Sequence, residues 1–248
     1  MNMRSAGFTI IETVLFLAIS GALAVAILAG SSIAIAQQRY RDAGTTLQTF
    51  LQRQYTNASN VVNNRTDNWT CNADATVQPQ DSAGPTAGAS DCVIMGKFIQ
   101  IKDGGKMVVA SDVIGRLRPD ATDPVTNDVD AFKQYSLAWT SVSQEKKQVD
   151  WGASLVHPAS EGGGSVDSSL LILRSPFSGV IRTFSPADYK PGEGSYVIPP
   201  SAIDGFSTKQ TYCLNSPDFT VFQRLAVIIR PGATSPSGIE LFGEESGC

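Results

Sequence analysis

The chain has 248 residues, of which 42% are hydrophobic and 17% are charged, and its formal net charge is −4. This acidic balance argues against a protein that binds nucleic acid over most of its surface. His157 is the only histidine, so a metal site with several histidine ligands cannot be assembled from this sequence. No other set of residues is arranged for catalysis, and we predict no enzymatic activity, no cofactor and no metal ion.

The first element is an apolar run that follows a short polar leader, residues 1–7. No charged residue occurs between Thr13 and Ala36. As a helix, these ~24 residues would extend roughly 36 Å, enough to cross a hydrocarbon core of about 30 Å. The run is longer than the apolar core of a cleaved secretory signal. An uncleaved signal anchor fits the length and an orientation with Arg4 inside, but it gives no reason for the acid Glu12 at the edge of the run.

The junction between the leader and the apolar run carries the motif GFTIIET, residues 7–13. Together with the basic residue of the leader and the long apolar run, this motif resembles the type III signal of type IV prepilins and pseudopilins. The resemblance implies that a prepilin peptidase cuts between Gly7 and Phe8 and then methylates the new amino group of Phe8. Glu12 would become the fifth residue of the mature chain. The resemblance covers roughly 30 of the 248 residues.

The resemblance implies an assembly role for Glu12 that has a physical basis. Cleavage exposes a positive amine on Phe8, and a carboxylate at nearly the same depth can neutralise the amine of a neighbouring subunit. An unpaired charge in a low-dielectric medium costs several kcal/mol, and pairing recovers much of that cost. The pair would therefore set the register of stacked helices. The alternative is that Glu12 only extends to the membrane surface, where water solvates it.

After Ala36 an apolar stripe continues at helical spacing. Its members recur every three or four residues and are Tyr40, Ala43, Leu47, Phe50, Leu51, Tyr55, Ala58, Val61 and Val62. No proline interrupts residues 8–78. We predict one helix over residues 8–63, membrane-spanning over about 13–36 and amphipathic over 37–63. The resemblance implies that a β-sheet covers the stripe.

From about residue 64 onward, glycine and proline become frequent and short β-rich runs replace the helical periodicity. The runs are residues 92–101, 107–109, 135–142, 170–173, 180–184, 196–198 and 219–229, and the last is the strongest candidate. Asp103 to Lys106 is typical of a hairpin turn, and residues 78–90 and 159–168 are predicted loops. We predict an α+β protein in which the long N-terminal helix packs on a mostly antiparallel sheet of a domain over residues 64–248. A domain of this size suits a minor filament subunit better than a main one.

The four cysteines all follow the apolar run: Cys71, Cys92, Cys213 and Cys248. An even number of cysteines in an exported domain indicates disulfides, and three pairings are possible. We favour Cys71 with Cys92 and Cys213 with Cys248, because each pair closes a loop of a few tens of residues worth about 3 kcal/mol in the chain-entropy model. Free or metal-bound thiols are the alternative, although no CxxC or CxxH spacing supports a metal site.

Two charged clusters and the histidine are further candidates. The acidic cluster is Asp120, Asp123, Asp128 and Asp130. Its spacing does not match an EF-hand, so we favour a solvated loop over a calcium site. The basic cluster is Arg174, Arg182, Arg224 and Arg230, on or beside predicted strands. A local DNA-binding patch is the minority interpretation of these arginines, and we interpret His157 as a surface residue.

The resemblance implies a minor pilin or pseudopilin, a subunit of a type IV pilus-like filament that serves adhesion, motility, secretion or DNA uptake. Its partners would be prepilin peptidase, other pilin subunits, the assembly platform protein with its ATPase, and the cytoplasmic membrane. The chain would cross that membrane once, with its N-terminus in the cytoplasm before processing, and would then join an extracellular or periplasmic filament. The rival is a single-pass, membrane-anchored extracytoplasmic binding protein or adhesin that does not polymerise. Processing after Gly7 separates the two.

Overall fold

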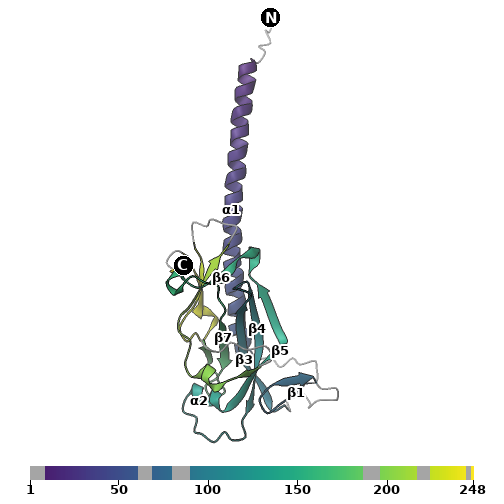
Figure 1. The fold of residues 1–248 in the computed structure, drawn as a ribbon, viewed down its shortest axis with the longest axis vertical. Helices are drawn as coiled ribbons and strands as arrows, with labels where there is room; N and C mark the ends of the chain where they lie inside the picture. Colours follow the sequence, from purple (N-terminus) through teal and green to yellow (C-terminus); the bar gives the residue numbers. More distant parts are fainter. Residues whose placement is uncertain (1–8, 61–68, 80–89, 187–195, 217–223, 244–246) are drawn as a thin grey trace.

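The computed structural model describes residues 9–60, 69–79, 90–186, 196–216, 224–243 and 247–248. A long helix, α1 (Ile10–Ser59), projects from one end of a globular part built of antiparallel sheets (Figure 1). The N-terminal half of α1 stands alone, and its C-terminal half runs through the globular part. The predicted α+β class and the predicted order of helix and sheet are therefore confirmed.

Helix α1 begins after Thr9, whose extended backbone and side-chain oxygen cap the first turn. The helix ends at Ser59, close to the predicted end, and the predicted residues 61–63 lie outside the described residues. Every described member of the predicted apolar stripe is buried: Tyr40, Ala43, Leu47, Phe50, Leu51, Tyr55 and Ala58. The 3.6-residue period therefore identified the face of α1 that contacts the sheets.

The larger sheet has six strands in the order β8-β7-β3-β4-β5-β9, and neighbouring strands are antiparallel. The strands are β3 (Cys92–Lys102), β4 (Met107–Leu117), β5 (Tyr135–Gln148), β7 (Ser169–Arg174), β8 (Ile181–Phe184) and β9 (Val197–Ile198). Each corresponds to a run predicted from the sequence. The predicted turn joins β3 to β4, and Asp103, Gly104 and Gly105 all have left-handed backbones there. At Gly105 a Cβ atom would overlap the carbonyl of Leu155, so only glycine fits.

The smaller sheet has four antiparallel strands in the order β12-β11-β10-β6. The strands are β6 (Ser154–Val156), β10 (Gln210–Asn215), β11 (Ala226–Ile229) and β12 (Ile239–Phe242). Only β11 was predicted, as part of the run 219–229. Of that run, residues 224–225 are not in a strand, and residues 219–223 lie outside the described residues.

Shorter elements complete the described fold. A two-stranded hairpin pairs β1 (Trp69–Cys71) with β2 (Val77–Pro79), so the start of the predicted loop 78–90 is a strand. The predicted loop 159–168 contains one short helical turn, η2 (Ala159–Glu161). The other short helices are α2 (Asp128–Lys133), η1 (Asp150–Gly152), η3 (Pro200–Ile203) and η4 (Pro236–Gly238).

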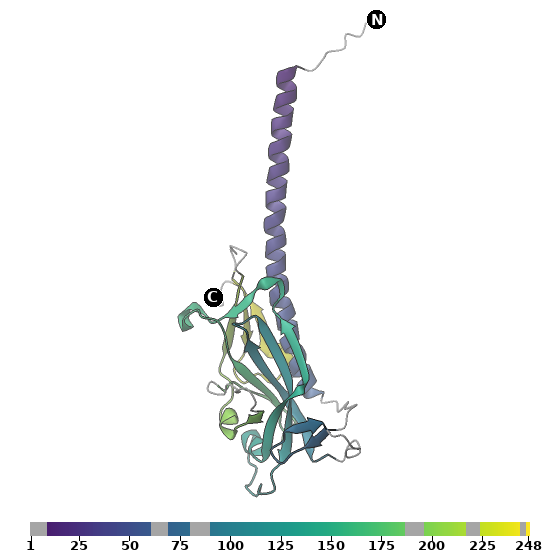
Figure 2. The same ribbon diagram turned by 45° about the vertical axis from the view of Figure 1, so that its right-hand side comes forward.

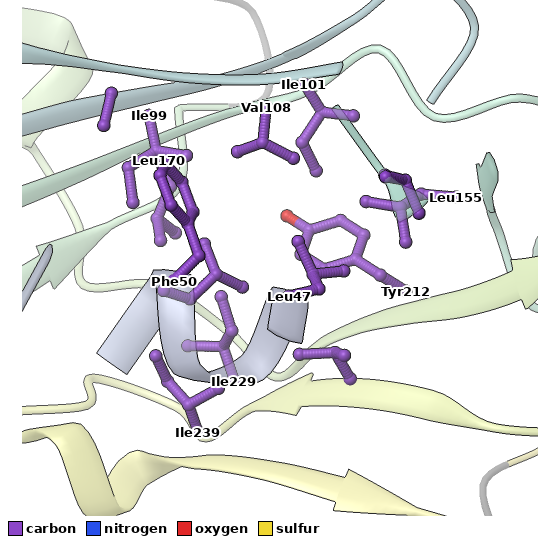
Figure 3. Packing of buried hydrophobic residues seen from close by; sticks show 14 of the residues in the cluster. Leu47, Phe50, Ile99, Ile101, Val108, Leu155, Leu170, Tyr212, Ile229 and Ile239 are labelled. Carbon is purple, nitrogen blue, oxygen red and sulfur yellow. The ribbon is translucent and has the colours of Figure 1, made fainter. Parts of the chain in front are cut away.

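The main core forms where α1 lies between the two sheets (Figure 3). Leu47 and Phe50 of α1 extend toward Ile99 and its neighbours of the larger sheet, and Ile229 and Ile239 of the smaller sheet lie on the other side of the helix (Figure 3). The opposite face of the larger sheet carries a second cluster rich in aromatic residues. The sequence predicted one sheet on the helix, whereas the structure places sheets on two sides of it.

This arrangement makes Leu47 a sensitive test of the core. Leu47 is 1% exposed, and Leu17, on the projecting half of the same helix, is 68% exposed. We expect Leu47→Ala to lower the free energy of unfolding by about 3–5 kcal/mol, because it leaves a cavity between two sheets. The matched variant Leu17→Ala should change it by less than about 0.5 kcal/mol. Urea unfolding of the full chain in detergent, followed by near-UV circular dichroism, measures both, and equal effects would contradict this account of the core.

Candidate functional site

The carboxylate of Glu12 lies in the first turn of α1, at its exposed end. The backbone N–H of Glu12 donates to Oγ1 of Thr9 (3.3 Å), and Oγ1 of Thr13 donates to the carbonyl of Ile10 (2.8 Å). An acidic side chain in this turn is favoured by the positive end of the helix dipole. Among the residues that the structure describes, no basic side chain forms a salt bridge with Glu12. The carboxylate is thus open to a cation from elsewhere.

The two residues of the predicted processing site, Gly7 and Phe8, lie outside the described residues. Cleavage between them and methylation of Phe8 therefore stay predictions. The described helix begins at Ile10, two residues after Phe8, so the predicted cut would fall just before the helix.

An uncharged and largely apolar surface follows Glu12 along the helix. Every residue from Ile10 to Ile35 is exposed. The helix is long and apolar enough to cross a membrane, and its most apolar window has a mean hydropathy of 2.4 with none of that window buried. An exposed Leu, Ile, Val or Phe side chain forgoes about 1.5–3 kcal/mol of burial free energy. The projecting half therefore needs a lipid or protein environment.

Hydrogen bonds hold the other half of α1 inside the globular part. At the point where the helix enters it, the hydroxyl of Tyr40 donates to the carbonyl of Leu214 (2.7 Å) and accepts from the N–H of Leu225 (3.1 Å). Nearly at the far end of the helix, the hydroxyl of Tyr55 bonds to that of Thr183 (2.8 Å). Both tyrosines are buried, where an unpaired polar group would be costly. Helix and sheets thus form one unit that a pull on α1 would move together.

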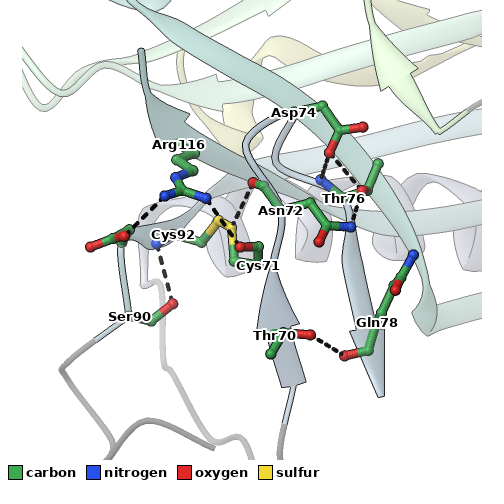
Figure 4. The surroundings of a disulfide bond; sticks show 10 residues. Thr70, Cys71, Asn72, Asp74, Thr76, Gln78, Ser90, Cys92 and Arg116 are labelled. Atoms are coloured by element: carbon green, nitrogen blue, oxygen red, sulfur yellow. Dashed lines mark hydrogen bonds and ion pairs between the residues drawn. A yellow bond between two sulfur atoms is a disulfide. The ribbon is translucent and has the colours of Figure 1, made fainter. Parts of the chain in front are cut away.

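The first favoured disulfide, Cys71–Cys92, is present (Figure 4). It joins the β1–β2 hairpin to the start of β3, with 6.1 Å between the two Cα atoms. Arg116 lies beside the bridge, donates to the carbonyl of Cys71 (3.2 Å) and pairs with Asp91 (3.1 Å) (Figure 4). The bridge and the arginine together fasten a small hairpin that has little core of its own.

The second favoured disulfide, Cys213–Cys248, is also present, with 5.6 Å between the Cα atoms. Cys213 belongs to β10, and its neighbour Leu214 is the residue that accepts the Tyr40 hydrogen bond. Arg224 donates to the carbonyl of Cys248. This bridge therefore reinforces the smaller sheet next to the point where α1 enters the globular part.

The prediction that the acidic cluster is a solvated loop is wrong for Asp128. Asp120 and Asp123 are exposed, but Asp128 is 6% exposed and starts α2. Its carboxylate accepts hydrogen bonds from Nε of Arg182 (2.6 Å) and from Oγ of Ser175 (2.7 Å). Burial alone would raise the pKa of Asp128, but hydrogen bonds from Ser175, Ser178 and Arg182 and the charge of Arg182 together lower that pKa below its usual value. Asp128 is a structural ion-pair residue.

The four candidate arginines all have protein partners. The pairs are Arg182 with Asp128, Arg230 with Glu240, Arg224 with the Cys248 carbonyl, and Arg174 with the Ser59 carbonyl at 3.3 Å. Carboxylates thus neutralise two of the four charges. Because phosphate binding needs uncompensated positive charge, this arrangement weakens the DNA-binding interpretation.

The remaining candidates are His157 and a possible metal site. His157 is partly exposed, and its Nδ1 lies 3.6 Å from a carboxylate oxygen of Glu161. Within the described ranges, no group of three or more His, Cys, Asp or Glu side chains is placed to hold a metal ion.

The sequence did not predict one contact of α1: Trp151 of η1 packs on Arg39, and its indole N–H donates to Asp42. No local pattern could indicate it, since 109 residues separate Trp151 from Asp42.

Comparisons with known proteins found no match to this chain among protein-family models, curated proteins or solved structures. The architecture itself is pilin-like: a long apolar N-terminal helix is packed on antiparallel β-sheets and carries an acid in its first turn. This architecture and the motif at residues 7–13 are therefore the features of the chain that point to a function.

Proposed function

We propose that the chain is a minor pilin or pseudopilin, a subunit that joins a type IV pilus-like filament after removal of residues 1–7. The single observation that carries this proposal is the projecting half of α1. It is exposed throughout, largely apolar, of membrane-spanning length, and starts with one acid, Glu12, that forms no salt bridge with any described residue. A membrane can cover the apolar surface before assembly, and the helices of neighbouring subunits can cover it afterwards.

In this proposal, the assembly step depends on charge pairing at the helix start. Removal of the leader would leave a positive amine on Phe8, four residues before Glu12. Bundled helices exclude water from this region, so an amine without a carboxylate would cost several kcal/mol. A stagger that places Glu12 of one subunit beside the amine of the next satisfies both charges. The pair would thus select one register among the many that apolar packing allows.

The globular part would transmit the force of assembly and form the surface of the filament. Because Tyr40, Tyr55 and the two flanking sheets hold α1, extraction of the helix from the membrane would carry the whole domain with it. The two disulfides suit a domain exposed to an oxidising extracytoplasmic compartment. The rival function is a membrane-anchored binding protein, which would use the same helix only as an anchor.

Cell fractionation tests the proposal against its rival. Filaments sheared from cells that express the chain are separated from membranes, and an antibody to the globular part measures the chain in each fraction. We expect the chain in the membrane fraction and, in smaller amount, in the filament fraction. Cells without the assembly ATPase should retain it only in the membrane. Confinement to the membrane in assembly-competent cells would favour the anchored binding protein.

A further inference from the structure

Arg39 marks the level at which α1 leaves an apolar environment. It is the first charged residue after Glu12. It follows Ala36 by three residues, or about 4.5 Å along a helix. When residues 13–36 cross a membrane, the guanidinium of Arg39 lies among the lipid headgroups, to which long basic side chains extend.

Trp151 of the globular part lies at the same level. The guanidinium carbon of Arg39 is 4.7 Å from the centre of the Trp151 ring, and the indole N–H donates to Asp42 at 3.1 Å. Asp42 is further from the span than Arg39, so the N–H is directed away from the membrane. The chain around residue 150 meets α1 where the helix enters the globular part (Figure 2). Trp151 is nevertheless 48% exposed.

Trp151 has a strained backbone conformation. Its φ is +58°, in the left-handed region that bulky residues rarely occupy, and Gly152 follows with φ +70°. The preceding residue, Asp150, is fixed by a hydrogen bond from Thr46 of α1 (2.6 Å) and by an ion pair with Lys147 (2.7 Å). A strained conformation persists only where its surroundings impose it, and such positions cluster at functional sites.

We propose that Trp151 and Arg39 form a contact between the globular part and the phospholipid headgroups of the membrane that α1 spans before assembly. This inference rests on the membrane-spanning state in the proposed function. Tryptophan is enriched at membrane interfaces, where its ring lies among headgroups, and arginine binds phosphate oxygens through its forked donors. The contact fixes the height and tilt of the domain above the membrane and keeps the unassembled subunit in one orientation.

A purely intramolecular role would make a different prediction. If Trp151 only joined η1 to α1, its stack on Arg39 and its bond to Asp42 would be enough, and lipid would not reach the ring. The two roles therefore differ in whether lipid lies against the indole. Trp69 and Trp139 are the other tryptophans of the chain. Trp139 is 9% exposed, and Trp69 belongs to β1, at the end of the globular part away from the projecting helix (Figure 1).

Lipid quenching of tryptophan fluorescence tests the inference. The full chain is reconstituted into vesicles of phosphatidylethanolamine and phosphatidylglycerol, with added phosphatidylcholine brominated either near the ester group or near the terminal methyl. We expect the shallow bromines to quench more strongly than the deep ones. Trp151→Phe should lose most of this quenching, whereas the matched variant Trp69→Phe should keep it. Phenylalanine keeps an aromatic ring that can stack on Arg39 and loses only the hydrogen bond to Asp42, so we expect the variant to retain the fold.

An insertion assay beside the quenching assay separates failure of the lipid contact from failure of the proposed function. Resistance to carbonate extraction shows whether the chain is inserted. Insertion with quenching that Trp151→Phe does not change, or with no quenching at all, would overturn the lipid contact and leave the proposed function intact. A chain that cannot be inserted would overturn both.

Discussion

Replacement of Gly7 by leucine is expected to abolish processing of the chain. A peptidase must bring its catalytic groups close to the scissile backbone, and glycine permits that approach because it has no side chain. A branched side chain next to the cut would block it. We expect immunoblots of membranes to show only the full-length form for Gly7→Leu, and sheared filaments to contain none of the chain.

The same substitution at Gly21 is the matched control. Gly21 lies within the predicted span, and a Cβ atom there would have no neighbour within 4 Å in the isolated chain. Gly21→Leu should therefore be processed normally, whatever it does to later packing between subunits. A mature-sized product from Gly7→Leu would show that the cut lies elsewhere.

Replacement of Glu12 by alanine should leave insertion and cleavage intact and reduce incorporation into filaments. The loss would leave the Phe8 amine of a neighbouring subunit without a carboxylate, at a cost of several kcal/mol in a low-dielectric bundle. Since about 1.4 kcal/mol corresponds to tenfold in an equilibrium, we expect at least a roughly tenfold decrease in the filament fraction. Quantitative immunoblots of sheared filaments, normalised to the processed chain in membranes, measure the change.

Two further variants separate the charge from local helix effects. Glu12→Gln keeps the length of the side chain and should lose as much incorporation as alanine. Thr13→Val changes the adjacent residue without a change of charge, and only its hydrogen bond to the Ile10 carbonyl is lost. It should assemble normally. Normal incorporation of both Glu12 variants would refute the register role, and the carboxylate would then be a solvated residue at the membrane surface.

The parts of the fold that sequence could predict are those with a strong local period. The stripe from Tyr40 to Ala58 repeats at helical spacing over several turns, so most of the buried face of α1 could be predicted, although the buried Gly44 and Gln54 were not. The strands of the larger sheet are rich in β-branched and apolar residues, and a turn containing two glycines separates β3 from β4. Glu12 was identified for a related reason, because a lone charge beside a long apolar run is conspicuous.

The parts that could not be predicted depend on long-range contacts. Strands β6, β10 and β12 contain polar as well as apolar residues, and pairing within the smaller sheet, of β10 and β12 with β11 and of β6 with β10, gives them structure that their own sequences do not specify. Asp128 appeared to belong to a solvated cluster because its partner Arg182 is 54 residues away. Trp151 similarly depends on residues of a distant helix. The role of a side chain could therefore be predicted only where its contacts are with residues close to it in the sequence.

The most direct test of the central claim is the intact mass and N-terminal residue of the protein purified from its native membrane. The proposed function predicts a chain that begins with N-methylated Phe8, has lost residues 1–7 and retains both disulfides. A chain that still begins at Met1, in cells with active prepilin peptidase, would contradict it and would identify α1 as a plain membrane anchor.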